Sequence, residues 1–321
     1  MVGGVKVRIV EALSPAGLSS FFAICDRDEK GRPIEDPLRI GAVGGGFKLS
    51  PAIRTKVVIE ETERPEVIVK INGRRQDEAL TSRNVVEDIL KLAGSPDVRI
   101  EVEHEIPYPI GAGFGTSGAG ALTLAVALSK ALKVNLTMLE LGRIAHVAEV
   151  RAKTGLGTVG ALMTAGSCII TRCPGAPGYG VIDSIPLDTT GLLLIVVYFG
   201  PILTKDVLSD KMAYERINKA GKETLKRVLN EPTVENLLRY SYEFACKAGF
   251  LTENVRRVEK LIKDEGLEVL GYAQNMLGDA VHLLVERGKA DELLIYLRRE
   301  LKGCKILLCG LDDSSVKLRR M

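Results

Sequence analysis

The sequence lacks the features of membrane-spanning and secreted proteins. Its longest purely apolar run, Leu192–Phe199, is far too short to cross a bilayer and predicts a buried strand instead. The N-terminal segment carries little positive charge and has no small-residue cleavage site after a long apolar core. We therefore expect no membrane partner, no secretion signal and a cytoplasmic location.

A strong excess of charge of either sign is also missing. The 44 Lys and Arg residues and the 41 Asp and Glu residues leave a net charge of only +3, and no stripe alternates basic and aromatic side chains. An extended nucleic-acid surface needs such features, so we expect no nucleic-acid partner. The length of 321 residues and the hydrophobic content of 46% predict a globular protein of about two domains.

Cysteine pairs with metal-binding spacing are absent. None of the six cysteines forms a Cys-x-x-Cys pair, and none has a histidine at metal-ligand spacing. We predict that they are buried free thiols in a reducing cytoplasm. They are Cys25, Cys168, Cys173, Cys246, Cys304 and Cys309.

Strand and helix patterns alternate along the first part of the chain and predict an α/β (α+β) fold. There we predict strands at Val5–Leu13, Thr55–Glu61 and Val98–Glu103, a hairpin through Asn72-Gly73, and helices at Asn84–Leu92, Ala119–Leu132 and 137–153. Later we predict strands at Ala165–Arg172, Leu192–Phe199 and Lys305–Cys309, and helices at Asp206–Asn218, Glu223–Asn230, Val234–Ala248, Thr252–Asp264 and Asp291–Leu301. Because the composition shifts to charged amphipathic helices beyond Pro201, we divide the chain into domains at 1–195 and 196–321.

A glycine-rich loop, Pro109–Gly120, joins a predicted strand to a predicted helix. Glycines allow positive φ and a close approach of the backbone to a ligand. Thr116 and Ser117 fall where a helix N-cap is expected, and the amides that follow have no intrahelical partner. Those amides and the helix dipole favour an anion, while a hydroxyl can reach a metal ion. The predicted phosphate-binding residues are Pro109, Gly111, Gly113, Gly115, Thr116, Ser117, Gly118 and Ala119.

Two common nucleotide-binding motifs do not account for this loop. It has no Gly-Lys-Ser/Thr, so it is not a P-loop. Residues 113–118 match Gly-x-Gly-x-x-Gly, but the acidic residue expected about 20 positions later, Glu140, falls inside a predicted helix instead of ending a strand. A tight turn that needs glycine only for its geometry is the alternative to a phosphate site.

The second helix after the loop carries polar residues on one face. Arg143, His146, Glu149 and Lys153 are three, three and four positions apart. A solvated stripe explains Arg143 and Lys153, whereas His146 and Glu149 stand among Ala and Val residues. A carboxylate near a phosphate site is most simply explained as a magnesium ligand. We therefore predict that Glu149 holds Mg²⁺.

The run from Pro109 to Ala119, Pro-x-x-x-Gly-Phe-Gly-Thr-Ser-Gly-Ala, resembles the central motif of the GHMP kinases, which is usually Pro-x-x-x-Gly-Leu-Gly-Ser-Ser-Ala. The resemblance implies an ATP site between an N-terminal and a C-terminal domain. It implies that the loop holds the phosphates of ATP and that Thr116 or Ser117 binds Mg²⁺. Most members have an Asp where this chain has Thr158, so Thr158 is expected to line the acceptor hydroxyl without acting as a strong base.

Segments spread over most of the chain resemble the archaeal pantoate kinases, a branch of the GHMP kinases. They are Leu13–Phe22, Asp36–Gly46, Ala145–Arg151, Thr154–Gly157, Thr171–Gly175 and Met276–Val281. This resemblance implies phosphorylation of (R)-pantoate by ATP to 4-phosphopantoate, an early step of coenzyme A synthesis in archaea. It implies that His146 and Arg172 contact pantoate, which suits a carboxylate substrate, and that Ala42 lines the same site. The predicted catalytic residues are Glu149, His146 and Thr158.

Two alternatives stay open at this point. One is a GHMP kinase for another small hydroxy acid or alcohol, such as homoserine or mevalonate. Ala42, Val43 and Thr158 depart from the family pattern, which leaves the identity of the substrate more open than the use of ATP. The other alternative is a nucleotide-binding paralogue with weak or no turnover, for which Thr158 leaves room. The expected partners are ATP, Mg²⁺ and a small-molecule substrate, and a homodimer is one option for the assembly.

Overall fold

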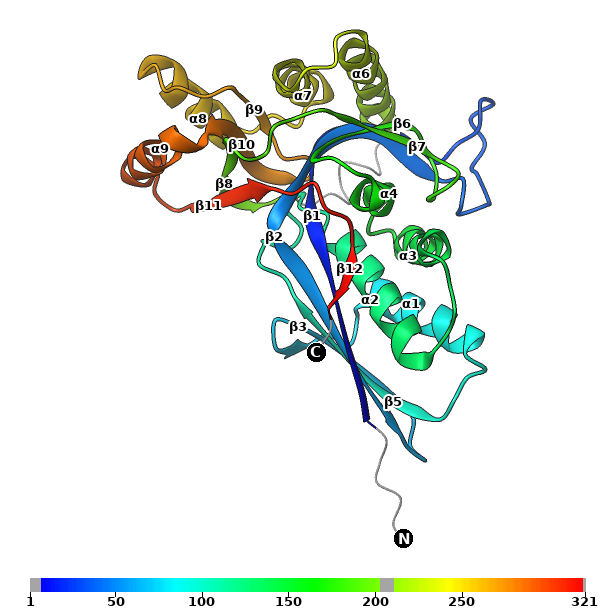
Figure 1. The fold of residues 1–321 in the computed structure, drawn as a ribbon. Coiled ribbons are helices and arrows are strands. Elements are labelled where there is room, and N and C mark those ends of the chain that lie inside the picture. The colour runs from blue at the N-terminus through cyan, green and yellow to red at the C-terminus, as the bar shows by residue number, and fades with distance from the viewer. Residues whose placement is uncertain (1–6, 203–210, 320–321) are drawn as a thin grey trace.

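The computed structural model describes residues 7–202 and 211–319 (Figure 1). The strands are β1 (Val7–Cys25), β2 (Gly41–Glu61), β3 (Glu66–Ile71), β4 (Arg74–Arg75), β5 (Val98–Glu105), β6 (Cys168–Cys173), β7 (Val181–Ile185), β8 (Leu192–Pro201), β9 (Gly271–Gln274), β10 (Gly278–Glu286), β11 (Lys305–Leu311) and β12 (Lys317–Arg319). The helices are α1 (Leu80–Leu92), α2 (Thr116–Leu132), α3 (Met138–Ala152), α4 (Thr158–Met163), α6 (Lys211–Asn230), α7 (Val234–Ala248), α8 (Glu253–Asp264) and α9 (Arg287–Glu300). The prediction of an α/β fold is confirmed.

The strands of the described ranges join into one 12-stranded sheet with β2 near its centre. β2 pairs antiparallel with β1, β5, β6 and β11. β1 and β2 run side by side from the Val7↔Glu60 pair to the Cys25↔Gly41 pair, so the strand predicted to end at Leu13 continues to Cys25. β3 and β5 pair in parallel, which makes the sheet mixed.

The helices cover different parts of this sheet (Figure 1). Helices α1, α2 and α3 lie together over the β1, β2 and β5 region, while α6 and α7 pack against the C-terminal end of β1. Helix α2 is apolar nearly all round, as predicted, and buries Leu122, Leu124 and Leu128 completely. No helix within the described residues is both long enough and apolar enough to cross a membrane.

Strand β8 explains why the run Leu192–Phe199 is apolar without alternation. Its residues Leu194 and Val196 pack into the main core, whereas residues 193, 195 and 197 pack into a second core formed with α8 and α9. A strand that is buried on both faces has no polar side, so the prediction of a buried strand is confirmed. The division into domains after residue 195 falls within β8 and stays a prediction.

Several predictions for the C-terminal half are wrong. The helices predicted at Asp206–Asn218 and Glu223–Asn230 form one helix, α6, and positions 206–210 lie outside the described residues. A Cβ on Gly221 would lie 2.0 Å from the Phe22 carbonyl oxygen, so glycine serves close packing there and does not end the helix. A further strand, β12, follows the predicted strand Lys305–Cys309 and pairs with β1, and the prediction lacks it. Strands β7, β9 and β10 are also missing from the prediction.

The six cysteines are free thiols, as predicted. Their predicted burial is only partly correct. Cys168 and Cys309 are buried, but Cys173 and Cys246 are exposed. Cys173 ends β6, and Cys246 lies in the last turn of α7. The spacing of cysteines and histidines in the sequence shows that no metal site is expected, but it does not show which side of a strand or helix faces solvent.

Candidate functional site

The glycine-rich loop follows β5, and its residues from Thr116 onward form the first turn of α2. Gly111, Gly113 and Gly115 have φ values of 75°, 79° and 55°, a region that favours glycine. The N-cap of α2 is Gly115, so the prediction of an N-cap at Thr116 or Ser117 is wrong. Because glycine has no side chain with which to cap the helix, the first amides of α2 stay available to an anion.

The loop backbone is held from one side through the three consecutive carbonyl groups of residues 112–114. Their donors, in the same order, are the side-chain amide of Asn275 at 3.3 Å, the N–H of Ser19 at 3.2 Å and the N–H of Gly17 at 3.1 Å. In a trans peptide the N–H points opposite to the C=O of the same unit. The amides of residues 113–115 therefore point away from these three donors, and no residue of the described ranges accepts a hydrogen bond from them. Consecutive outward amides form an anion-binding concavity.

Phe114 anchors this loop in the core. Its buried ring stacks on Tyr108 with 4.9 Å between the ring centroids, and the Tyr108 hydroxyl donates to the Pro51 carbonyl at 2.9 Å. Sequence reasoning missed this role. The available signal is a large apolar residue between two glycines, in a loop that would otherwise expose it.

A turn from the C-terminal half, Asn275–Gly278, packs against the same loop. The N–H of Met276 donates to the Ser19 carbonyl at 2.9 Å. A Cβ on Gly113 would lie only 2.2 Å from the Met276 carbonyl oxygen, so the loop and the turn touch without room for a side chain. The turn belongs to the Met-Leu-Gly segment noted in the sequence, which the fold places at the predicted phosphate site.

Glu149 lies on the face of α3 that packs against the start of α2. Its side chain is buried, at 2% exposure, and its Oε2 atom has no hydrogen-bond partner within the described residues. A Cβ on Gly118 would lie 2.8 Å from Oε2, and one on Gly155 would lie 2.3 Å from Oε1. Burial raises the pKa of this carboxyl group to about 7, against a smaller opposing effect of the Ser117 hydroxyl. The two glycines thus leave space for a carboxylate whose Oε2 atom the described residues do not satisfy.

Ser117 is oriented by a short series of hydroxyl groups. Its Oγ donates to Thr154 Oγ1 at 2.9 Å, and Thr154 is hydrogen-bonded to Thr81 Oγ1 at 2.8 Å. The same hydroxyl also acts on the Glu149 carboxyl group, so the Ser117 oxygen lies between Thr154 and Glu149, and its lone pairs can accept from or coordinate a further partner. Thr116, the first residue of α2, is buried at 8% exposure.

Thr158 lies next to the loop, and Ala42 lies near Gly157, the residue before Thr158. A Cβ on Gly115 would lie 2.5 Å from the Thr158 methyl group, which places Thr158 against the last glycine before α2. A Cβ on Gly157 would lie 3.8 Å from the Ala42 side chain. The structure therefore brings Ala42, Thr158, the loop and Glu149 into one region.

His146 and Arg172 differ in how close they come to this region. The buried ring of His146 donates from Nε2 to the Ile40 carbonyl at 2.9 Å, which ties the segment before Ala42 to α3. Burial lowers the pKa of His146, so its ring is neutral near pH 7. Arg172 is exposed on β6, with its guanidinium 3.4 Å from the Asp183 carboxylate, and it makes no described contact with the loop.

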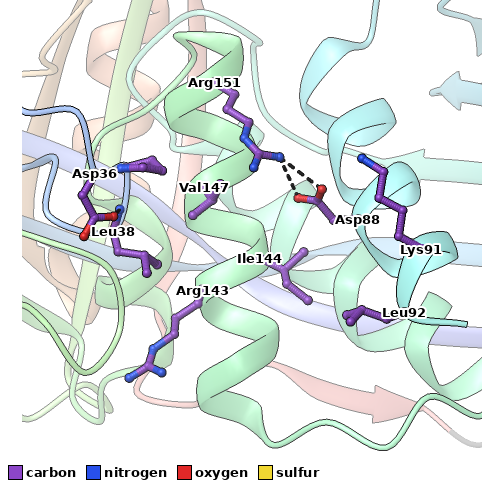
Figure 2. A pocket seen from close by; sticks show the side chains of 10 residues that line it. Asp36, Leu38, Asp88, Lys91, Leu92, Arg143, Ile144, Val147 and Arg151 are labelled. Carbon is purple, nitrogen blue, oxygen red and sulfur yellow. Dashed lines mark hydrogen bonds and ion pairs between the residues drawn. The ribbon is translucent and has the colours of Figure 1, made fainter.

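A cavity of about 470 Å³ lies on the opposite side of α3, between that helix, α1 and the segment 36–38 (Figure 2). From α3 it is lined by Arg143, Ile144, Val147 and Arg151. Arg143 donates to the Pro177 carbonyl at 3.0 Å and so turns away from the face that carries Glu149. Figure 2 shows Arg151 reaching Asp88 across the cavity, at 3.0 Å. This cavity is separate from the glycine-rich loop.

Comparison with known proteins matches this arrangement. Residues 80–166, which include the loop, α2 and α3, match the model of the GHMP kinases N terminal domain. Over 298 residues the chain is 32% identical to the pantoate kinase of Thermococcus kodakarensis, an alignment that covers 89% of this chain and 92% of that protein. The chain belongs to the pantoate kinase family. It is also 27% identical over 285 residues to the family member from Methanocaldococcus jannaschii, covering 89% and 96% of the two chains.

A solved structure supports the same assignment. It is described as a phosphotransferase related to the coenzyme A biosynthesis pathway, and it matches with a TM-score of 0.85 at 28% identity, covering 98% of this chain and 99% of that one. The fold is thus the GHMP kinase fold, as the resemblance implied, and the chain is an ATP-dependent kinase.

Proposed function

We propose that this protein transfers the γ-phosphoryl group of ATP to (R)-pantoate, forming ADP and 4-phosphopantoate. The observation that carries the proposal is the buried Glu149 carboxylate, which has an unpartnered oxygen beside the first turn of α2. A carboxylate next to an anion site suits a nucleotide with its metal ion. The pantoate kinases that share 27% and 32% of their residues with this chain support pantoate as the acceptor.

The loop and the start of α2 would hold the phosphates of ATP. Outward amides from residues 113–115 and the positive end of the α2 dipole both favour negative charge. The proposed contacts are the loop residues predicted from sequence: Pro109, Gly111, Gly113, Gly115, Thr116, Ser117, Gly118 and Ala119.

The residues present also fit a magnesium ion. Mg²⁺ is usually held by one or two carboxylates together with nucleotide phosphates, and no cluster of three His, Cys, Asp or Glu side chains in the described ranges could hold a metal alone. Glu149 offers an unsatisfied carboxylate oxygen, and Ser117, with Thr116 beside it, offers a hydroxyl. When bound, the ion offsets the negative charge on the transferring phosphoryl group.

The acceptor would bind on the side of the loop where Thr158 and Ala42 lie. A threonine hydroxyl cannot accept a proton usefully near neutral pH, so Thr158 lines the acceptor hydroxyl and the rate comes from alignment and charge stabilisation. Arg172 is exposed and its guanidinium can form a bidentate pair with a substrate carboxylate. His146 is proposed as a further pantoate contact, and its bond to Ile40 also holds the segment beside Ala42.

We further propose that this reaction serves coenzyme A synthesis in an archaeal cytoplasm. The names and source organisms of the two pantoate kinases, and the description of the matching phosphotransferase structure, support this setting. A homodimer stays a prediction.

A panel of acceptors tests the proposed reaction. Purified protein would be incubated with ATP, Mg²⁺ and either (R)-pantoate, homoserine or mevalonate, and ADP release would be measured together with the mass of the product. We expect ADP release that depends on both pantoate and Mg²⁺. Faster turnover of homoserine or mevalonate would show that this compound, and not pantoate, is the acceptor. ATP binding without turnover of any compound would identify a nucleotide-binding paralogue.

A further inference from the structure

A chain of buried polar side chains runs from β1 through β10 to the glycine-rich loop. Ser20 Oγ lies 3.0 Å from His282 Nε2, and His282 Nδ1 lies 2.9 Å from Asn275 Oδ1. Asn275 Nδ2 then reaches the carbonyl oxygen of Ala112 at 3.3 Å. The three residues Ser20, His282 and Asn275 are all 0% exposed. Buried polar groups of this kind are stable only when their hydrogen bonds are made, so these hydrogen bonds fix the orientations of the three side chains.

The donors and acceptors of these side chains fix which atom donates in each hydrogen bond. The Ala112 carbonyl can only accept, so the amide nitrogen of Asn275 must face it and the amide oxygen must face His282. His282 therefore donates from Nδ1 and accepts at Nε2 from the Ser20 hydroxyl. This requires a neutral ring, and burial lowers the pKa of His282 to about 3, so the ring is neutral over the working pH range.

The Asn275 side chain is not needed to close its own turn. Backbone bonds already do this: the Asn275 N–H donates to the Ala280 carbonyl at 2.8 Å, and the Gly278 N–H donates to the Asn275 carbonyl at 3.3 Å. Of the three donors to the carbonyls of residues 112–114, Asn275 is the one side chain, while the other two are backbone groups of β1. Its orientation therefore depends on His282 and not on the path of the main chain.

The Ala112 carbonyl and the Gly113 N–H belong to the same peptide unit and point in opposite directions. Holding the carbonyl toward Asn275 turns the amide toward the side where we place the phosphates. We propose that Asn275, oriented by His282 and Ser20, is a positioning residue that aims the Gly113 amide at the phosphates of ATP. The proposal rests on ATP binding at the loop, and it is independent of which acceptor is used.

Two substitutions at His282 separate this role from simple packing. The side-chain nitrogen of Asn superposes on His Nδ1, and that of Gln on His Nε2, so H282N keeps the donor to Asn275 whereas H282Q keeps only the contact with Ser20. The readout is the Kd of a non-hydrolysable ATP analogue with Mg²⁺, measured by calorimetry. We expect H282Q and N275L to weaken binding about threefold to tenfold, and H282N to restore it to within about twofold of wild type. The KM for pantoate should not change in any of the three.

Other results would overturn the proposal. Equal affinity of H282N and H282Q, with both proteins showing a cooperative thermal transition, would do so, as would a parallel rise in the KM for ATP and for pantoate. Failure of the wild-type protein to bind the analogue would contradict both the proposed ATP site and the proposed role of Asn275. A wild type that binds the analogue without phosphorylating pantoate would remove only the proposed acceptor, and the comparison of affinities would still decide the role of Asn275.

Discussion

A buried carboxyl group loses its hydrogen bonds to water, and the protein supplies few hydrogen bonds to the Glu149 carboxylate in their place. Gly118 and Gly155 border the carboxylate where larger residues would fill the space, and Oε2 has no described partner. A packed core would not keep an acid in this position, because burial alone raises its pKa to about 7. The residue is better explained by a cation that arrives with the nucleotide than by the stability of the empty protein.

Replacing Glu149 with Gln should therefore stabilise the metal-free protein at pH 8. The pKa rises from 4.5 in the unfolded chain to about 7 in the folded protein, so below pH 4.5 the group is protonated in both states and costs nothing. Between these pKa values the folded protein binds the proton more tightly than the unfolded chain does. The free energy of unfolding of the wild type therefore falls as the pH rises and levels off above about pH 7, where it is about 3 kcal/mol lower than at low pH. Chemical denaturation of both proteins from pH 5 to pH 8 in EDTA measures the difference.

The same substitution should remove Mg²⁺-dependent turnover while the fold is kept. Excess Mg·ATP should also raise the stability of the wild type more than that of E149Q, because only the carboxylate gains a partner. Unchanged turnover in E149Q would take Glu149 out of the site. A variant no more stable than wild type at pH 8 would show that the carboxylate is already satisfied without a metal ion.

In the glycine-rich loop, the glycines are required for different reasons, and two of them form a matched pair. Gly111 and Gly113 have nearly the same φ, at 75° and 79°, so alanine at either position pays a similar strain of about 1 kcal/mol. A Cβ at Gly111 meets nothing within 4 Å, whereas a Cβ at Gly113 would lie 2.2 Å from the Met276 carbonyl oxygen. G113A should therefore weaken binding of an ATP analogue at least tenfold, and G111A less than about threefold. Equal losses in calorimetry would mean that the contact with Met276 does not position the loop.

The sequence was sufficient for elements whose signals are local. Glycine clustering located the loop, helical spacing located α2 and α3, and the Ala and Val residues around Glu149 separated it from a solvated stripe. The support beneath the loop could not be predicted in this way. The Asn275 amide and the Ala112 carbonyl are 163 positions apart, and neither Asn275 nor His282 stands in a pattern that differs from ordinary core sequence. Only the pairing of distant strands places them together.

At the scale of the whole molecule, a buried lysine joins three distant parts of the chain. Lys48 on β2 is 1% exposed, and its Nζ donates to the carbonyls of Thr164 at 2.6 Å, Ser314 at 2.5 Å and Asp313 at 3.4 Å. Burial lowers its pKa, and the nearby charges of Asp312 and Asp313 oppose this shift. The ammonium group thus links β2 to the end of α4 and to the segment that leads into β12.

Replacing Lys48 with Met keeps much of the side-chain volume but leaves these carbonyl groups without their donor. We expect K48M to lower the free energy of unfolding by about 1 to 3 kcal/mol, because water can reach only part of the site to replace the lost bonds. Lys56 is on the same strand, and its side chain makes no described hydrogen bond or ion pair, so K56M supplies the control and should change stability by less than about 0.5 kcal/mol. Hydrogen exchange should also accelerate at residues 317–319, which pair with β1, in K48M alone. Equal destabilisation by both substitutions, with β12 still protected, would mean that β12 is held by its pairing with β1 and not through Lys48.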